Sequence, residues 1–235
     1  MPFSNGTEDI VVLTGHGRYA DPWHPFAATS EILRGWLQAA GAGESVVIVE
    51  DVDGQLRRWG EGEPLPRLVV ANLGLPRDGG IAPADAQATR GLERLLNADV
   101  PTLALHVSAT TFTDASAWRE LLGGHWIRGT SWHPPQDAFT VRALPTQTVP
   151  APELGDGSTV DERYALLERD PDVVVIAEHE VDGHPEPTAW FLERGTRRAA
   201  YISLGHDETA FGPVMRSLFI AALRWTLPTA TEGDA

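Results

Sequence analysis

A short, mostly apolar run that ends in a histidine constrains the fold of this chain most strongly. The segment 102–105 follows Pro101, and His106 and the small or hydroxylated residues 108–111 come directly after it. A run of this length between a proline and a polar cluster is typical of a buried parallel strand. In an open α/β sheet the ligand crevice lies outside the carboxyl ends of the strands. His106 is therefore expected at a binding edge.

Two further predicted strands end in the same way. The first, at 10–14, runs into Gly15-His16-Gly17, and the last, at 199–204, runs into Gly205-His206-Asp207-Glu208. A single histidine at a strand end more often bonds a neighbouring carbonyl than carries a function. Three parallel strands that each deliver a histidine to one edge argue for a common site.

Strand and helix signals alternate along the chain. Short β-branched runs predict strands at 10–14, 45–50, 68–72, 102–105 and 199–204. Apolar residues at helical spacing predict helices over 26–40, 82–98, 115–122 and 211–227. The N-terminal order, strand-helix-strand-strand-helix-strand, is that of a parallel sheet with helices on both faces. Trp59 falls in a predicted loop, and Pro83 is expected in the first turn of its helix.

The C-terminal half adds antiparallel signals. An edge strand is expected at 139–144, and Asp182-Gly183 predicts a hairpin between strands at 173–177 and 188–193. His179 and His184 flank this turn and are expected in solvent. The closing helix should face the sheet with Val214, Leu218, Ala221, Ala222 and Trp225. We expect one domain over 10–227, a flexible segment 1–9, a Pro/Gly-rich excursion at 145–158 and a disordered tail 228–235.

Composition excludes several classes of function. The 235 residues include 33 acidic and 18 basic ones, which gives a net charge of −15, and no cysteine. The negative charge argues against a nucleic-acid partner. The lack of cysteine excludes disulfides, thiolate zinc sites and a cysteine nucleophile, so any metal would rest on histidines and carboxylates. Since no apolar run reaches the length of a membrane span and no export signal is visible, we expect a cytoplasmic protein without a membrane partner.

Loops near the strand ends hold further candidates. Asp21, Trp23 and His24 follow the first strand, although their spacing fits no standard zinc pair. Trp132 and His133 lie in a segment rich in Gly and Pro, which could form a sugar-stacking wall or a hydrophobic latch over one sheet edge.

The segment 161–164 carries two acids beside an aromatic residue. Asp161, Glu162 and Tyr164 could bind substrate hydroxyls or supply a carboxylate to a metal. The alternative is a solvated turn with a capping aspartate.

Five segments in this order resemble the ThuA-like (trehalose utilisation) family of the class I glutamine-amidotransferase-like superfamily. They are TGHGRYADPWHPF, LHVSATTF, LLGGHW with SWHPP, DERY, and YISLGHDETAF, and the resemblance covers nearly all of 10–225. It implies an α/β fold of the flavodoxin-like type, a three-layer α/β/α sandwich with a mostly parallel sheet. It also implies a role in the metabolism of disaccharides or their oxidised derivatives.

The resemblance places His106, His206 and Glu208 where related amidotransferases carry a cysteine nucleophile and a histidine–glutamate pair. Glutaminase activity is excluded because the thiolate is missing. Two readings of these candidate catalytic residues stay open. With His16 or His24, the two histidines could hold a divalent metal such as zinc, manganese or nickel, oriented by Glu208. Alternatively, they could act as a metal-free acid/base pair.

Either reading suits an enzyme that hydrolyses, or transfers a proton on, a disaccharide or keto-sugar. The substrate-binding candidates are Asp21, Trp23, Ser108, Trp132, His133, Asp161, Glu162 and Tyr164. The expected ligand is a small sugar, no nucleotide cofactor is expected, and a homo-oligomer is compatible with the sequence. One alternative is a non-catalytic sugar-binding or regulatory module. Another is a scaffold whose histidines only satisfy buried backbone groups.

Overall fold

The computed structural model describes residues 9–42, 45–144, 146 and 154–227. The segments 1–8 and 228–235 and most of the first part of the 145–158 excursion lie outside the described residues. The helices are α1 Phe26–Ala39, α2 Val52–Glu61, α3 Ala86–Asn97, α4 Ser116–Leu122 and α5 Pro213–Thr226, with 3-10 turns η1 Gly17–Tyr19 and η2 His106–Thr110.

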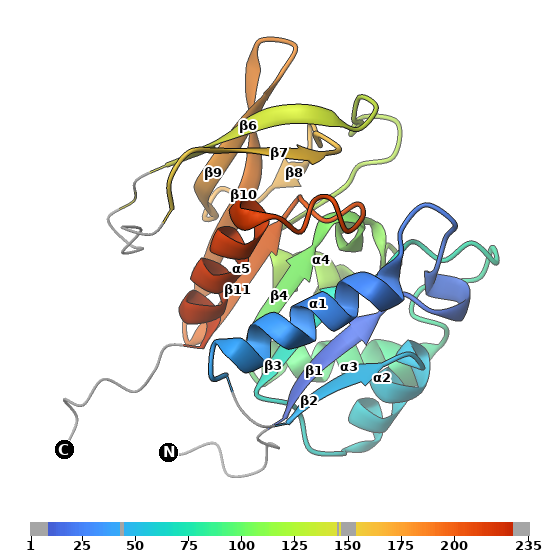
Figure 1. Ribbon diagram of the computed structural model, residues 1–235. Helices are drawn as coiled ribbons and strands as arrows, with labels where there is room; N and C mark the ends of the chain where they lie inside the picture. The colour runs from blue at the N-terminus through green and yellow to red at the C-terminus, as the bar shows by residue number, and fades with distance from the viewer. Residues whose placement is uncertain (1–8, 43–44, 145, 147–153, 228–235) are drawn as a thin grey trace, which may run out of the picture.

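The strands run from the N-terminus as β1 Ile10–Thr14, β2 Val46–Val49, β3 Leu68–Asn72, β4 Thr102–Leu105, β5 Gly124–His125, β6 Asp137–Ala143, β7 Gly157–Asp161, β8 Glu168–Arg169, β9 Val174–Val181, β10 His184–Arg194 and β11 Arg197–Ile202. Nine of them form one sheet in the order β2-β1-β3-β4-β11-β10-β9-β6-β7 (Figure 1). The first five in that order are parallel to one another, and the remaining four continue the sheet in antiparallel pairs.

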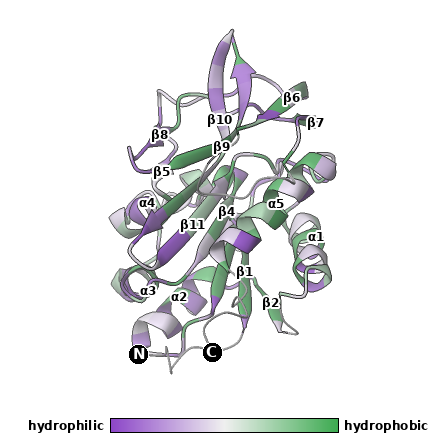
Figure 2. Ribbon diagram, turned by 90° about the vertical axis from the view of Figure 1, so that its left-hand side faces the viewer, coloured by the Kyte–Doolittle hydropathy of each residue, from purple (hydrophilic) through white to green (hydrophobic). Residues whose placement is uncertain are grey.

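Helices cover both faces of the parallel part, which makes three layers. One hydrophobic core joins the sheet to α1 and α5, and includes Leu33 and Leu218. The other joins the opposite face to α2, α3 and α4, and includes Leu56 and Leu92. In Figure 2, β1 and β4 are largely hydrophobic, whereas the flanking helices carry both hydrophobic and hydrophilic residues. A strand buried on both faces needs such a continuous apolar run, so the predicted flavodoxin-like α/β sandwich is confirmed.

The strands of the parallel part agree with their predicted positions, but the stretch between β2 and β3 was wrongly expected to be a loop. It contains α2, whose apolar residues Val52, Leu56 and Trp59 recur at helical spacing and are buried. The Asp51 carboxylate accepts a hydrogen bond from the Gly54 amide and caps the helix. Trp59 is 2 % exposed and lies in the core rather than in a loop.

Glycines let α2 approach α3 unusually closely. A Cβ atom on Gly91 would lie 2.1 Å from the Leu56 carbonyl oxygen, and one on Gly60 would lie 2.2 Å from that of Gln87. Larger residues at these positions would force the helices apart. The close contact explains how a helix with several charged residues and two internal glycines is stable: its stability comes from packing rather than from intrinsic propensity.

Other boundaries also differ from the predictions. Helix α3 begins after the Asp85 cap, and Pro83 precedes it in a cis peptide with Ala82. Strand β6 is not at the edge of the sheet, because β7 pairs with its outer side. The buried face of α5 is formed by Met215, Leu218, Phe219, Ala222, Leu223 and Thr226, so Val214, Ala221 and Trp225 are only partly buried at its margins.

Candidate metal centre

Four side chains converge at the carboxyl edge of the parallel strands. They are His24, His106, Glu162 and His206, and one nitrogen or oxygen atom of each lies within 4.8 Å of the corresponding atoms of the others. His24 lies in the loop after β1, His106 directly after β4 and His206 in the loop after β11. Glu162 directly follows β7 of the antiparallel part. Segments that follow three parallel strands thus meet the end of one antiparallel strand.

His106 is fixed by its backbone and by its Nδ1 atom. It begins η2 with a φ of +44°, a left-handed conformation that turns the chain sharply after β4. Its Nδ1 atom lies 2.7 Å from the Ser203 carbonyl oxygen, which can only accept, so Nδ1 carries the proton. The Nε2 atom therefore faces the cluster, where it lies 3.2 Å from the Tyr164 hydroxyl.

His24 is oriented by a turn that Asp21 forms. The Asp21 carboxylate accepts hydrogen bonds from the backbone amides of Trp23 and His24, which is an Asx turn. Both of its oxygens also lie 2.8 Å from His24 Nδ1, so this nitrogen is the donor. The opposite atom, Nε2, is buried and has no hydrogen-bond partner among the described residues. Burial, and then the neighbouring His106, lower the pKa of His24 to about 4, so its imidazole is neutral at pH 7.

His206 is held in place by Asp161. The buried carboxylate of Asp161 accepts hydrogen bonds from the amides of Gly205 and His206, at 2.7 and 3.3 Å. Gly205 has a φ of +133°, and a Cβ atom there would lie 3.3 Å from the Cβ of His106. His206 Nδ1 is also buried without a hydrogen-bond partner in the described part of the chain. The backbone at this position thus brings two histidines together.

Glu162 completes the cluster with its carboxylate. Its oxygens lie 3.3 Å from His106 Nε2 and 3.4 Å from His206 Nδ1. Neighbouring ligands of one tetrahedral zinc ion, each about 2.1 Å from the metal, lie roughly 3.4 Å apart. Burial opposes ionisation of Glu162, but His106, His133 and His206 together lower the pKa of its carboxyl below the ordinary value. For His106, burial is likewise outweighed, chiefly by Glu162 and Asp161, which raise its pKa.

Two of the predicted site residues lie outside this cluster. His16 precedes η1, which directs it outward: its side chain is 65 % exposed, and its Nε2 atom lies 4.0 Å from a Glu50 oxygen. His24 is therefore the histidine of the first loop that faces the site. Glu208 lies exposed in the turn after His206, and the carboxylate beside His206 belongs to Glu162 instead.

Three substrate-binding candidates have their polar atoms engaged within the protein. Ser108 is fully buried, and its hydroxyl bonds the Leu73 amide and the Ala71 carbonyl. Asp21 and Asp161 are occupied with the loops that carry His24 and His206. A ligand cannot reach these groups without breaking native hydrogen bonds. Asp21 and Asp161 therefore act through the histidine loops they hold, and Ser108 ties η2 to the end of β3.

Of the aromatic candidates, His133 and Tyr164 contact the cluster, and the two tryptophans are partly exposed to solvent. Trp23 and Trp132 are 56 % and 38 % exposed, and the Arg77 guanidinium stacks over the Trp23 ring. His133 Nδ1 lies 3.6 Å from a Glu162 oxygen. The buried Tyr164 ring stacks on His106, with 4.5 Å between the ring centroids.

His179 is buried, contrary to the prediction that it lies in solvent. It is 3 % exposed; its Nε2 atom donates to the Tyr164 carbonyl oxygen and its Nδ1 atom accepts from the Thr188 hydroxyl. Burial lowers the pKa of His179 to about 4. The strand carries it to the inner face of the hairpin, which supports the segment next to Glu162. His184 is exposed as expected.

Comparisons with solved structures support the fold. A ThuA-like protein from Parabacteroides merdae is 14 % identical over 95 % of this chain and 91 % of its own, with a TM-score of 0.69. A second one, from Bacteroides uniformis, is 14 % identical over 96 % and 94 %, with a TM-score of 0.65. A cytoplasmic protein from Salmonella typhimurium is 14 % identical over 93 % and 98 %, with a TM-score of 0.53. No curated protein sequence matches.

The helices of the described residues include none long and apolar enough to cross a membrane.

Family membership follows from the sequence itself. The family model described as "ThuA: Trehalose utilisation" matches residues 68–226, more than half of the chain, and this range includes His106, Glu162 and His206. The chain therefore belongs to the ThuA family, whose description indicates a role in carbohydrate metabolism.

Proposed function

We propose that this protein is an enzyme of carbohydrate metabolism that binds a divalent metal through His24, His106, Glu162 and His206. The observation that carries the proposal is the convergence of four potential ligand atoms within 4.8 Å. Imidazole and carboxylate ligands of this kind suit zinc, manganese or nickel.

The hydrogen bonds around the cluster support a metal over a bare acid/base pair. His24 Nε2 is buried and has no hydrogen-bond partner among the described residues, which costs free energy unless something binds it. His206 Nδ1 also makes no hydrogen bond there, although it faces a Glu162 oxygen at 3.4 Å. The carboxylate of Asp21 fixes the tautomer of His24, and the Ser203 carbonyl fixes that of His106. Such contacts behind the ligands are the usual companions of metal-bound histidines.

The proposed substrate is a disaccharide or keto-sugar. A divalent metal would supply Lewis-acid polarisation of a sugar carbonyl or hydroxyl. His133, which is partly exposed and lies 3.6 Å from Glu162, is available to exchange a proton with a bound sugar. The exposed rings of Trp23 and Trp132 offer apolar faces for a pyranose ring. Hydrolysis and proton transfer are both compatible with this set of groups.

The decisive experiment measures metal content by plasma mass spectrometry on protein purified without an affinity tag. We expect a near-stoichiometric metal in the wild type, and its loss in His24→Ala and His206→Ala. His16→Ala is the matched control, because it removes a histidine from the same loop but not from the cluster. The binding of oxidised disaccharides and their conversion are then tested on the same samples.

A wild-type protein that takes up no zinc, manganese or nickel would overturn the metal proposal and leave the acid/base pair of His106 and His206. Stoichiometric sugar binding without conversion on long incubation would favour the non-catalytic module. The proposal includes a cytoplasmic location, supported by the described location of the Salmonella typhimurium neighbour.

A further inference from the structure

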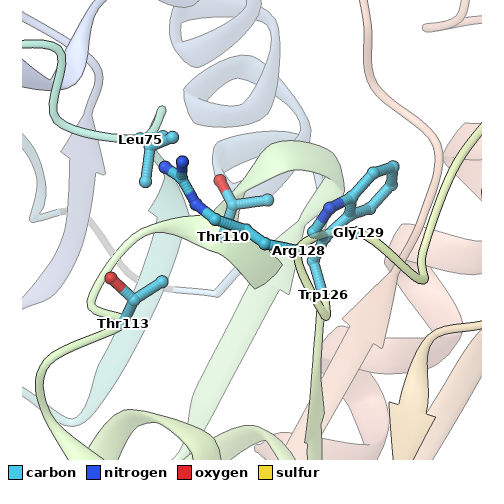
Figure 3. Close-up of a pocket in the computed structure, with 6 residues that line it drawn as sticks. All are labelled: Leu75, Thr110, Thr113, Trp126, Arg128 and Gly129. Atoms are coloured by element: carbon cyan, nitrogen blue, oxygen red, sulfur yellow. The ribbon is translucent and has the colours of Figure 1, made fainter.

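A cavity lies close to the four-residue cluster, next to the aromatic rings that pack on His106. It has a volume of about 360 Å³ and is lined by Leu75, Thr110, Thr113, Trp126, Arg128 and Gly129. Ligand pockets begin at about 300 Å³, so this cavity suits a molecule as small as one sugar ring. In Figure 3 the Arg128 side chain runs past Thr110 toward Leu75, and the Trp126 indole lies on its other side. An aromatic face, two hydroxyls and a guanidinium thus share one cavity.

Arg128 is a free cation in a strongly acidic protein. Its guanidinium makes no hydrogen bond or ion pair with any described residue. Other arginines of the described residues do: Arg18, for example, pairs with Asp53 and Asp78. None of the six residues lining the cavity is acidic. Arg90, Arg169 and Arg216 are exposed and unpaired among the described residues in the same way, so what distinguishes Arg128 is its place in the lining of a cavity.

Another cavity of similar size has the opposite charge, because it is lined by acidic residues. This cavity borders the loop after β1, has a volume of about 310 Å³, and is lined by Glu50, Asp51 and Asp53 among others. An anionic ligand would be repelled there and attracted to Arg128. The guanidinium presents a planar fork of donors that matches a carboxylate with two parallel hydrogen bonds.

The Arg128 cavity is separated from the metal centre by one layer of aromatic rings. Trp126 packs edge-on against Tyr164, with 4.8 Å between centroids, and Tyr164 in turn bonds His106. Trp126 also lies 5.9 Å from the ring of His133. Thr110 belongs to η2, the turn that begins at His106. The cavity therefore lies next to the cluster, with Trp126 and Tyr164 between its lining and His106.

We infer that the substrate carries an acidic sugar ring, and that Arg128 binds its carboxylate while Trp126 packs on the ring. This inference rests on the proposed function, since it names the substrate class of the same site. The Thr113 hydroxyl is then available to a ring hydroxyl, whereas the Thr110 hydroxyl, which donates to the Val107 carbonyl, can only accept.

Isothermal titration calorimetry with D-glucuronate, D-glucose and D-glucose 6-phosphate tests the inference. We expect D-glucuronate to bind the wild type most tightly, and Arg128→Gln to weaken it at least about tenfold, the usual effect of losing a charged hydrogen-bond donor. Arg90→Gln is the matched control, because Arg90 is an exposed arginine of α3 outside the cavity. Arg128 touches no other side chain by a hydrogen bond or ion pair among the described residues, so the variant should fold normally.

Equal affinity of Arg128→Gln and the wild type for D-glucuronate would overturn the inference, as would no measurable binding of D-glucuronate or a preference for D-glucose. A preference for D-glucose 6-phosphate that depends on Arg128 would replace the carboxylate by a phosphate. Metal content is measured on the same samples and separates the two proposals. If metal is present and Arg128→Gln has no effect on binding, only the proposal of an acidic sugar is wrong. If D-glucuronate binds but no metal is found, only the proposal of a metal centre is wrong.

Discussion

Replacement of Asp21 by asparagine should weaken metal binding without unfolding the loop. The Asp21 side chain is 1 % exposed, and both of its oxygens lie 2.8 Å from His24 Nδ1. Asparagine keeps an oxygen for the backbone amides of Trp23 and His24, but it removes the negative charge behind the imidazole. Its amide group can also donate to Nδ1, which would place the imidazole proton on Nε2, the atom that faces the cluster.

The loss of such a partner behind a metal-bound histidine typically weakens metal affinity by about 10–100-fold, or roughly 1.4–2.7 kcal/mol. We expect Asp21→Asn to fall in this range when zinc is titrated against a chromophoric chelator. Asp182→Asn, in the exposed hairpin turn, is the matched control because asparagine tolerates its left-handed φ of +51°. If Asp21→Asn binds zinc as tightly as the control does, Asp21 does not orient a ligand.

Three further predictions concern stability. Chelation of the metal should lower the melting temperature measured by calorimetry by about 5–10 °C relative to protein with free metal at about 100 times its Kd, where binding adds about 2.7 kcal/mol; an unchanged melting temperature would speak against metal bound to the folded state. His179 has a pKa of about 4 in the folded chain and about 6.5 in the unfolded chain. Its contribution to the free energy of unfolding is therefore complete above pH 6.5, and about 3 kcal/mol is lost as the pH falls to 4. Urea titrations across this range should show a flatter pH dependence for His179→Gln, and parallel curves would contradict the assignment. Gly205→Ala should lower the free energy of unfolding by roughly 1–3 kcal/mol, whereas Gly212→Ala, at a φ of −83° with open space around it, should cost less; equal losses in urea unfolding would show that the backbone at Gly205 is unstrained.

The parallel part of the fold could be predicted because its signals are local. Each buried strand is a short apolar run, and the strands β1 and β3 have the predicted bounds. Helix α2 was missed because its stability depends on contact with α3 through Gly60 and Gly91, which the spacing of its few apolar residues does not reveal. The burial of His179 likewise depends on pairing between distant segments.

The candidate site was predictable at the strand ends but not in the loops. His106 and His206 directly follow or nearly follow parallel strands, so their convergence follows from topology. Which of His16 and His24 faces the cluster depends on the Asx turn of Asp21. Glu162, and not the predicted Glu208, lies beside His206 because of where the antiparallel strands meet the parallel part of the sheet. The sequence signal for Glu162 was its place beside Asp161 and Tyr164. That signal indicated a site but did not show that the Glu162 side chain points toward the histidines.

The position of β11 has a consequence for how the protein is made. This strand lies between β4 and β10, and it is the last strand of the sheet to leave the ribosome. The segment that carries Glu162 is synthesised earlier, yet within the sheet it connects to the parallel strands only through β11. The four side chains of the cluster therefore meet only when synthesis has passed residue 206. A nascent chain that is interrupted before this point lacks His206 and so holds an incomplete cluster.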